Sequence, residues 1–431
     1  MSNLPKDRGD GVQAPDAVAE RSDPLPRLRR RALVVLTVGQ ILGGLGVGAT
    51  LSVGAVAANN LAGAAWSGIA ATVMTLGAAM LAVPLAQLAD RKGRRVSLSM
   101  AALIAAAGAG LCVLALSAGS AVLLFTGLGL IGAATAAGLQ SRFAATDLAS
   151  VTSRGRDLSL VVWSTTIGAV AGPNLAGPGN IVGAALGLQP LAGVFLFPVV
   201  SQLLAAGVYL IWMRPDPLLE SRRLAVLAGQ GRGQAPTGGG LGNPTLVRVA
   251  IVTLSLSHAT MVALMSMTPV HLVHGGATLS VIGLTISLHI AGMFALSPVF
   301  GVLADRLGRF PTIALGQAML LAAAVITGLG AHHTGVVMLG LTVLGLGWSA
   351  STVAGSALLS DAASAAQRVR LQGRSDLVMN LAGALGGAVS GPVLALLGYP
   401  GLAWILLLPV IAVLTAGSLG VHRSRRVQVA G

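Results

Sequence analysis

Two similar stretches, "LAQLADRKGRR" at residues 85–95 and "VFGVLADRLGRF" at residues 299–310, decide the fold. Each joins two apolar segments and carries an Asp followed by Arg residues. A second pair, "RDLSLVVWSTTIGAVAGP" at 156–173 and "SDLVMNLAGALGGAVSGP" at 375–392, keeps its Asp and its final Pro sixteen residues apart in both copies. The chain therefore consists of two halves with the same internal order.

The composition is that of a membrane protein. Hydrophobic residues make up 54% of the chain and charged residues only 9%, whereas a soluble surface needs far more charge. The apolar runs are about 20 residues long, which matches the hydrocarbon core of a bilayer. We predict an all-α integral membrane protein with twelve transmembrane helices in two pseudo-symmetric six-helix bundles. The predicted spans are 32–57, 66–89, 96–117, 121–147, 158–183, 190–213, 245–273, 278–303, 311–330, 335–360, 376–398 and 401–420.

The net charge of +14 reflects topology and does not indicate a nucleic-acid partner. Lys and Arg residues fall at the two termini, in alternate loops and at the neighbouring helix ends. Such an asymmetry places those loops in the cytoplasm. We therefore expect a multi-pass protein of the cell membrane with both termini cytoplasmic. The expected organisation is a cytoplasmic tail at 1–31, a six-helix half at 32–213, a cytoplasmic linker at 214–244, a second six-helix half at 245–420 and a cytoplasmic tail at 421–431.

The repeated loop resembles a signature of the major facilitator superfamily, and the resemblance covers about residues 30–420. That superfamily implies a secondary transporter that works by alternating access. The pattern G-x-L-A-D-R-x-G-R is complete in the second half, whereas Ala86 replaces the leading Gly in the first. The gating residues that it implies are Asp90, Arg91, Gly93, Arg94, Gly301, Asp305, Arg306, Gly308 and Arg309.

An Asp gains stability near the positive N-terminal end of a helix. The start of span 11 is therefore a candidate partner for Asp90, and the start of span 5 for Asp305. We expect these contacts to hold one side of the transporter shut, with Arg142 and Asp147 serving the same gate. The alternative is a solvated basic turn that only fixes topology.

Glycine and proline recur at matching places in spans 5 and 11. Small residues allow helices to approach closely, and Pro bends a helix. The predicted packing motif consists of Gly168, Gly172, Pro173, Gly387, Gly391 and Pro392. Several polar residues inside spans either line the central cavity or bond a neighbouring helix: Gln40, Gln140, Asn174, Trp348 and Asn380.

Methionine and histidine gather in spans 7 and 8. Met261 and Met265 are four residues apart, as are His289 and Met293, so each pair shares a helix face. Thioethers with imidazole suit Cu(I), and these four residues form our candidate copper site. Possible entry or accessory ligands are His258, Met267, His271 and His274. The rival interpretations are Met as filler in an apolar helix and His289 as a group that takes a proton or bonds an organic substrate.

The Met-x-x-x-Met and His-x-x-x-Met patterns resemble the CcoA-like copper importers of the superfamily, whose relatives include riboflavin importers. The sequence therefore predicts copper import, with copper as substrate and no cofactor. An organic cargo remains the alternative, either an exported drug or metabolite or an imported riboflavin-type vitamin, and a non-transporting membrane sensor is a third. We find no nucleotide-binding motif and no catalytic triad, so we expect that the protein is not an enzyme. The expected partners are the substrate and the lipid bilayer, and we expect a monomer.

Overall fold

Helices make up almost all of the structure. The computed structural model describes residues 24–63, 66, 69–150, 152–189, 191–230 and 243–415, and no strand occurs among them. The predicted tails before residue 24 and after residue 415, and the linker stretch 231–242, lie outside the described residues. The elements in chain order are α1 (Pro24–Ala62), α2 (Ile69–Ala118), α3 (Ala121–Ala144), α4 (Arg154–Ala171), η2 (Pro173–Leu175), α5 (Ala176–Ala185), η3 (Ala192–Phe195), α6 (Leu196–Trp212), α7 (Pro217–Gln230), α8 (Pro244–His274), α9 (Leu279–Phe294), α10 (Ser297–Arg306), α11 (Arg309–Leu329), α12 (Thr334–Ala362) and α13 (Arg368–Ile405).

The predicted all-α membrane fold is confirmed. Within the described ranges, nine helical segments are long and apolar enough to cross a bilayer. Two of these, at 69–118 and 368–415, are long enough for two crossings each. The fifth predicted span is shared between α4 and α5 and forms no single long helix. The helices thus account for the twelve predicted spans.

The two repeated loops contain sharp turns at equivalent glycines. Gly93 interrupts α2 with a φ of 88°, and Gly308 precedes α11 with a φ of 102°. A side chain at either position would clash with the backbone in this left-handed region, and only glycine adopts it without strain. These two turns reverse the chain between spans 2 and 3 and between spans 8 and 9.

Three segments differ from the prediction. Span 5 breaks at Gly172 because Pro173 cannot continue the helical hydrogen bonding. Span 8 is α9 followed by α10, with a break at Ala295 and Leu296 just before Pro298. The linker, for which no secondary structure was predicted, contains α7.

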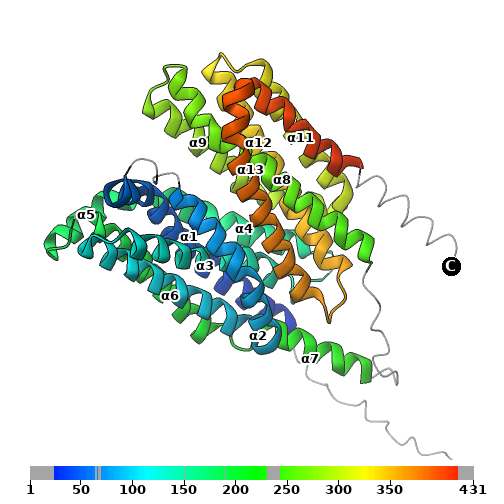
Figure 1. The fold of residues 1–431 in the computed structure, drawn as a ribbon. Helices are drawn as coiled ribbons and strands as arrows, with labels where there is room; N and C mark the ends of the chain where they lie inside the picture. The colour runs from blue at the N-terminus through cyan, green and yellow to red at the C-terminus, as the bar shows by residue number, and fades with distance from the viewer. Residues whose placement is uncertain are drawn as a thin grey trace, which may run out of the picture.

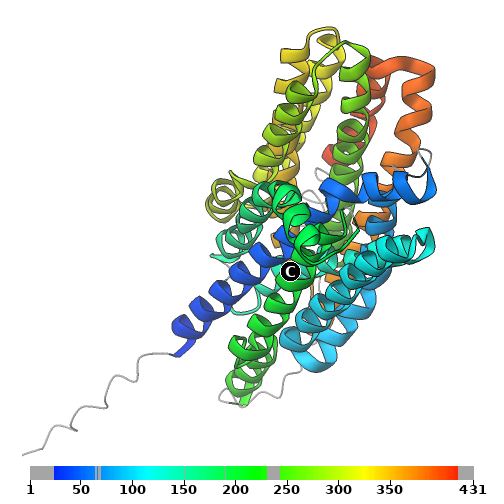
Figure 2. The same ribbon diagram turned by 90° about the vertical axis from the view of Figure 1, so that its left-hand side faces the viewer.

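Helices α1–α6 form one group and α8–α13 another (Figures 1 and 2). The two groups contact each other chiefly through α2 with α13 and α4 with α10. These contacts lie toward the end of the molecule that carries Gly93, Gly308 and α7, which we call the arginine-rich end. The groups diverge toward α5 and α9 (Figure 1). The exact limits of the predicted halves stay a prediction.

Candidate gate and substrate site

Asp305 joins the second half to the start of α4 in the first half. Its carboxylate accepts hydrogen bonds from the backbone N–H groups of Gly155 (2.9 Å) and Arg156 (2.8 Å). It also pairs with the guanidinium of Arg309, one turn further along its own loop. The carboxylate therefore serves as an N-terminal cap for a helix of the opposite half, the position where charge and helix dipole are favourable together.

Asp90 in the first half has a different set of partners. Arg370, near the start of α13, reaches its carboxylate at 3.0 Å from the second half. Arg222 of α7 bonds both the carboxylate and, at 2.7 Å, the main-chain oxygen of Asp90. Asp90 thus contacts the start of span 11 through a side chain, whereas Asp305 contacts span 5 through the backbone.

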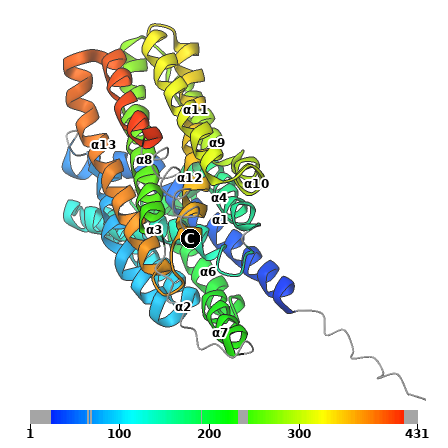
Figure 3. The same cartoon turned by 90° about the vertical axis from the view of Figure 1, so that its right-hand side faces the viewer.

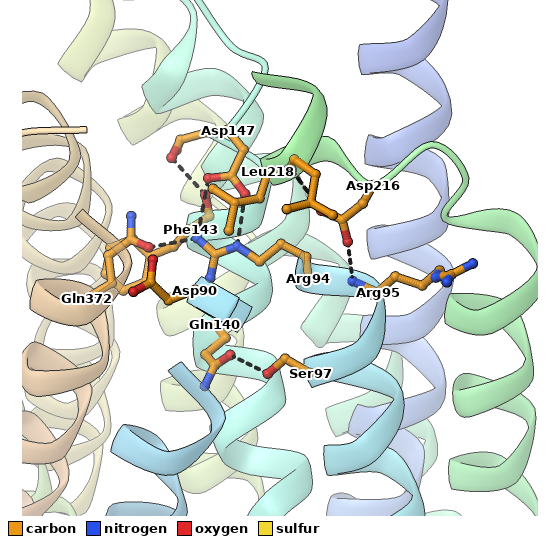
Figure 4. Close-up of polar contacts among 12 residues, drawn as sticks. Asp90, Arg94, Arg95, Ser97, Gln140, Phe143, Asp147, Asp216, Leu218 and Gln372 are labelled. Atoms are coloured by element: carbon orange, nitrogen blue, oxygen red, sulfur yellow. Dashed lines mark hydrogen bonds and ion pairs between the residues drawn. The ribbon is translucent and has the colours of Figure 1, made fainter. Parts of the chain in front are cut away.

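The linker helix α7 contacts the same loop of the first half. Asp216 caps α7 through the N–H groups of Leu218 and Leu219, and accepts a further bond from the N–H of Arg95 at 2.7 Å (Figure 4). Leu218 packs in a small buried cluster with Ala86, Ala89 and Val369. That cluster brings together α2, α7 and α13, so the linker helix takes part in the contact between the halves.

The motif arginines form equivalent ion pairs, of which the first is buried and the second partly buried. Arg94 is 1% exposed; it bonds Asp147 of its own half at 2.8 Å and Gln372 of the other half at 2.8 Å (Figure 4). Its counterpart Arg309 bonds Asp361 at 3.0 Å, and Asp361 also pairs with Arg154 across the interface. Each half therefore links its own Arg–Asp pair to the opposite half.

The remaining motif residues lie as follows. Arg91 and Arg306 are exposed and carry no ion pair to a described residue. Gly301 packs on the backbone of Gly155, where an added Cβ would sit about 2.5 Å from its carbonyl oxygen. In the first half the equivalent Ala86 packs on Gly373. The methyl group that replaces the missing motif glycine is therefore accommodated by a glycine on the partner helix.

A further ion pair lies deeper between the halves. Arg142 of α3 bonds Asp376 of α13, and both side chains are at most 2% exposed. Arg142 also lies 3.8 Å from the sulfur of Met379, one turn further along α13. Two of the pair's polar atoms, Arg142 Nε and Asp376 Oδ2, have no hydrogen-bond partner among the described atoms. Removing one partner of such a buried ion pair is strongly destabilising, because the other charge is left buried without a partner.

An aromatic row follows this pair toward the opposite end. The indole N–H of Trp348 donates to His258 Nδ1 at 3.1 Å, and Phe294 meets the Trp348 ring edge-on with 5.8 Å between centroids. His258 packs against Gly383, seven residues beyond Asp376 on α13. Phe294 packs against a cluster that includes Leu158 of α4 in the first half. The row thus lies near the interface between the halves.

Three of the four candidate copper ligands, the methionines, belong to one apolar cluster, and the fourth, His289, contacts α12. That helix contacts both α8 and α9 extensively, while α8 and α9 contact each other little. Met261 and Met293 are buried in an apolar cluster with Leu341 and Leu344 of α12, and Met265 packs at its edge. The candidate copper site stays a prediction.

His289 points at α12. Its Nδ1 lies 2.8 Å from the carbonyl oxygen of Leu341, so Nδ1 must carry the proton. Nε2 then presents a lone pair, is buried, and has no hydrogen-bond partner among the described atoms. The accessory candidates lie elsewhere: Met267 packs on the same apolar cluster, His271 stacks on Tyr399 and donates to Ala331, and His274 is exposed.

The predicted glycine motif behaves differently in the two halves. Gly168 and Gly172 touch the backbone of α1 at Gly44 and Gly48, where any Cβ would clash. Gly387 and Gly391 make no comparably close backbone contact, because α13 approaches α8 at Gly386 and Gly383 instead. Pro173 starts the short η2 turn, whereas Pro392 lies inside α13.

The predicted cavity-lining amides mostly bond neighbouring groups. Gln40 is half-buried and donates to Thr165 at 2.8 Å. Gln140 is buried and bonds Ser97 (Figure 4), Asn380 is buried and donates to the Asp376 carbonyl, and Asn174 donates to Val170 at an exposed position. Each of the four thus bonds a neighbouring group, and their place in the cavity stays a prediction.

Sequence reasoning missed several partners of the gate. Three side chains bond the motif residues without having been predicted: Asp361, Gln372 and Arg222. A further unpredicted ion pair joins Arg29 of α1 to Asp157 of α4, with N–O distances of 2.6 and 2.7 Å. A charged residue next to a membrane span is a usable signal, because such residues are expensive to bury and are usually paired. It does not identify the partner.

The comparisons with known proteins agree with this geometry. The chain is 37% identical over 397 residues to the MFS-type transporter YddS of Bacillus subtilis, covering 89% of this chain and 91% of the relative. The chain belongs to the major facilitator superfamily. The sequence model described as Major Facilitator Superfamily also matches residues 249–430. The riboflavin transporter RfnT of Brucella anthropi is 28% identical over 89% of this chain and 94% of that protein.

Solved structures show the same fold. The human organic anion transporter MFSD10 superposes with a TM-score of 0.73 at 17% identity, over 89% of this chain and 99% of that one. The proton:xylose symporter XylE gives 0.71 at 18% identity, over 90% and 94% of the two chains. This chain is thus a multi-pass membrane transporter of the major facilitator superfamily.

Proposed function

We propose that this transporter carries an organic small molecule by alternating access, driven by an ion or substrate gradient. In this proposal the arginine-rich end faces the cytoplasm of the cell and is closed in the conformation described here. The support is a set of polar contacts that joins the halves at this end: Asp305 with the start of α4, Asp90 with Arg370, and Arg94 with Gln372.

The observation that carries the choice of cargo is the aromatic row Phe294–Trp348–His258 beyond the Arg142–Asp376 pair. Aromatic rings stack on planar apolar groups, and the imidazole adds a hydrogen-bonding group at one end. The relationship to a riboflavin transporter supports a planar, polar-edged cargo of this kind. In this proposal the substrate contacts the aromatic row, and the Arg142–Asp376 pair separates the site from the arginine-rich end.

Uptake by proteoliposomes tests this proposal, with radiolabelled riboflavin as the first substrate in a panel of planar organic molecules. Trp348→Ala should raise the KM for the transported molecule by about fivefold, since stacking contributes roughly 1 kcal/mol beyond burial. Trp404→Ala is the matched control, because Trp404 is 40% exposed and packs beside Gly328 on α11. Equal effects of the two substitutions would contradict a substrate role for the aromatic row.

Copper remains a second candidate cargo because of one observation: the Nε2 lone pair of buried His289 has no hydrogen-bond partner in the described part of the chain. Met293, one turn away on the same helix, is the nearest thioether in sequence. If copper is carried, His289→Ala should abolish uptake of radioactive copper while His332→Ala, at an exposed loop position, leaves it intact. Absence of copper uptake by the wild-type protein would remove this candidate.

A further inference from the structure

A groove lies between the start of α1 and the end of α6, on the outer surface of the first half at the arginine-rich end. Its volume is about 550 Å³. Figure 3 shows the first turns of α1 extending at the end of the molecule where α6 and α7 lie. The groove is lined by Arg27, Arg30, Arg31, Val34, Val35, Val38, Val208 and Trp212.

The rim of the groove carries three cations that have no acidic partner within residues 24–415 as far as these are described. Arg27, Arg30 and Arg31 are exposed, and none forms an ion pair with a described residue. Residues three and four apart lie on one face of a helix, so all three guanidinium groups project on the same side of α1. Arg29 has the opposite orientation and is bound by Asp157. Arg29 thus forms an ion pair within the protein, whereas the other three arginines face outward.

The floor of the groove is apolar and continues from the rim along the helix. Val34 and Val38 follow Arg30 at intervals of one turn, roughly 6 Å each, and are 56% and 38% exposed. Trp212 at the end of α6 is 53% exposed, and its carbonyl oxygen accepts a bond from Arg31 Nε at 3.1 Å. Trp is favoured where a helix leaves the hydrocarbon core. The rim therefore lies at headgroup level and the floor at the level of the acyl chains.

We propose that this groove binds an anionic phospholipid of the leaflet at the arginine-rich end. The phosphate and its negative charge lie against Arg27, Arg30 and Arg31, and an acyl chain lies along Val34, Val38 and Trp212. Basic pockets between transmembrane helices recognise anionic headgroups in this way. A zwitterionic lipid would leave the three cations uncompensated. The occupied groove also stabilises the first turns of α1, from which Arg29 reaches Asp157.

Native mass spectrometry of the full-length protein, titrated with dioleoyl phosphatidylglycerol or dioleoyl phosphatidylcholine, tests the proposal. Each cation near an anionic lipid contributes about a fivefold gain in affinity. The variant Arg27→Gln, Arg30→Gln, Arg31→Gln should therefore weaken the first phosphatidylglycerol binding step by more than about tenfold and leave phosphatidylcholine unaffected. The charge-matched control is Lys92→Gln, Arg223→Gln, Arg306→Gln, which should change neither lipid.

Val34→Trp provides an independent variant, since it fills the floor without changing the charge. Val34→Trp should weaken phosphatidylglycerol binding, so the proposal can be tested with this variant if the triple variant does not fold. Soluble glycerol 3-phosphate, which carries the phosphate without acyl chains, should show no saturable binding. Equal affinity for the two lipids, equal losses in the triple variant and its control, or binding of glycerol 3-phosphate as tight as that of the lipid would each overturn the proposal.

Discussion

Replacement of Asp305 by Asn should open the arginine-rich end. The carboxylate accepts two backbone hydrogen bonds from α4, at 2.9 and 2.8 Å, and pairs with Arg309. Its side chain is 8% exposed, so solvent weakens these interactions little. Asn keeps the size of the residue and one acceptor oxygen. It removes the negative charge and places an amide donor where an acceptor is needed.

The magnitude follows from the lost contacts. Hydrogen bonds to a charged group contribute about 1.5–3 kcal/mol each, and the charge at the helix start adds up to about 1 kcal/mol. Asn retains part of one bond, so the closed state should lose about 3 kcal/mol relative to the open state. A difference of that size changes the ratio of the two states roughly a hundredfold.

Distances between spin labels on the two halves measure this ratio. Cys112 is the only cysteine and is buried, so introduced cysteines at exposed Lys92 and Leu307 can be labelled selectively. Asp305→Asn should add a population with a longer distance between these labels. Arg306→Gln, an exposed cation in the same loop, should leave the distribution as in the wild type. An unchanged distribution in Asp305→Asn would refute the assignment of Asp305 to the gate.

Three further predictions concern other parts of the gate. Arg222→Ala should lengthen the same distance, since it removes both bonds from α7 to Asp90; the neighbouring Arg223→Ala should not, and equal effects would exclude a specific role for Arg222. Gly373→Leu should also favour the open form, because its side chain would enter the space of Ala86; an unchanged label distance would show that this contact does not limit closure. Arg94→Ala should lower the free energy of unfolding by about 3–5 kcal/mol by leaving the buried Asp147 unpaired, and adding Asp147→Asn should recover part of that loss. Thermal unfolding measures both variants, and a double variant no more stable than the single one would contradict the pairing.

The sequence predicts the parts of this structure that depend on local pattern. The spacing of apolar runs gives the spans, and the duplicated loop gives the turns at Gly93 and Gly308, because glycine is needed where the chain reverses. A negative charge is favourable at a helix N-terminus, so the sequence predicts the start of span 5 as the partner of Asp305. In the structure Asp305 bonds the first turn of α4, at the start of that span. These inferences need no knowledge of how the helices are arranged side by side.

Contacts between distant helices were not accessible in the same way. Helical periodicity places His289 and Met293 on one face of their helix, but not which neighbour that face meets, and in the structure it meets α12. The buried pair of Arg142 with Asp376 joins residues 234 positions apart. Helix α7 was missed because it is too short and too charged to register as a membrane span, and its contacts come from Asp90 and Arg95.

Counterflow in proteoliposomes tests the central claim most directly. Vesicles loaded with unlabelled substrate are placed in a trace of the labelled compound, with no ion gradient, so that only a carrier with alternating access accumulates label. The account predicts transient accumulation of a planar organic molecule from the panel by the wild-type protein, and at least about tenfold slower accumulation by Asp305→Asn, whose halves no longer close the arginine-rich end. Accumulation of copper but of no organic molecule, or equal rates in both proteins, would contradict the account.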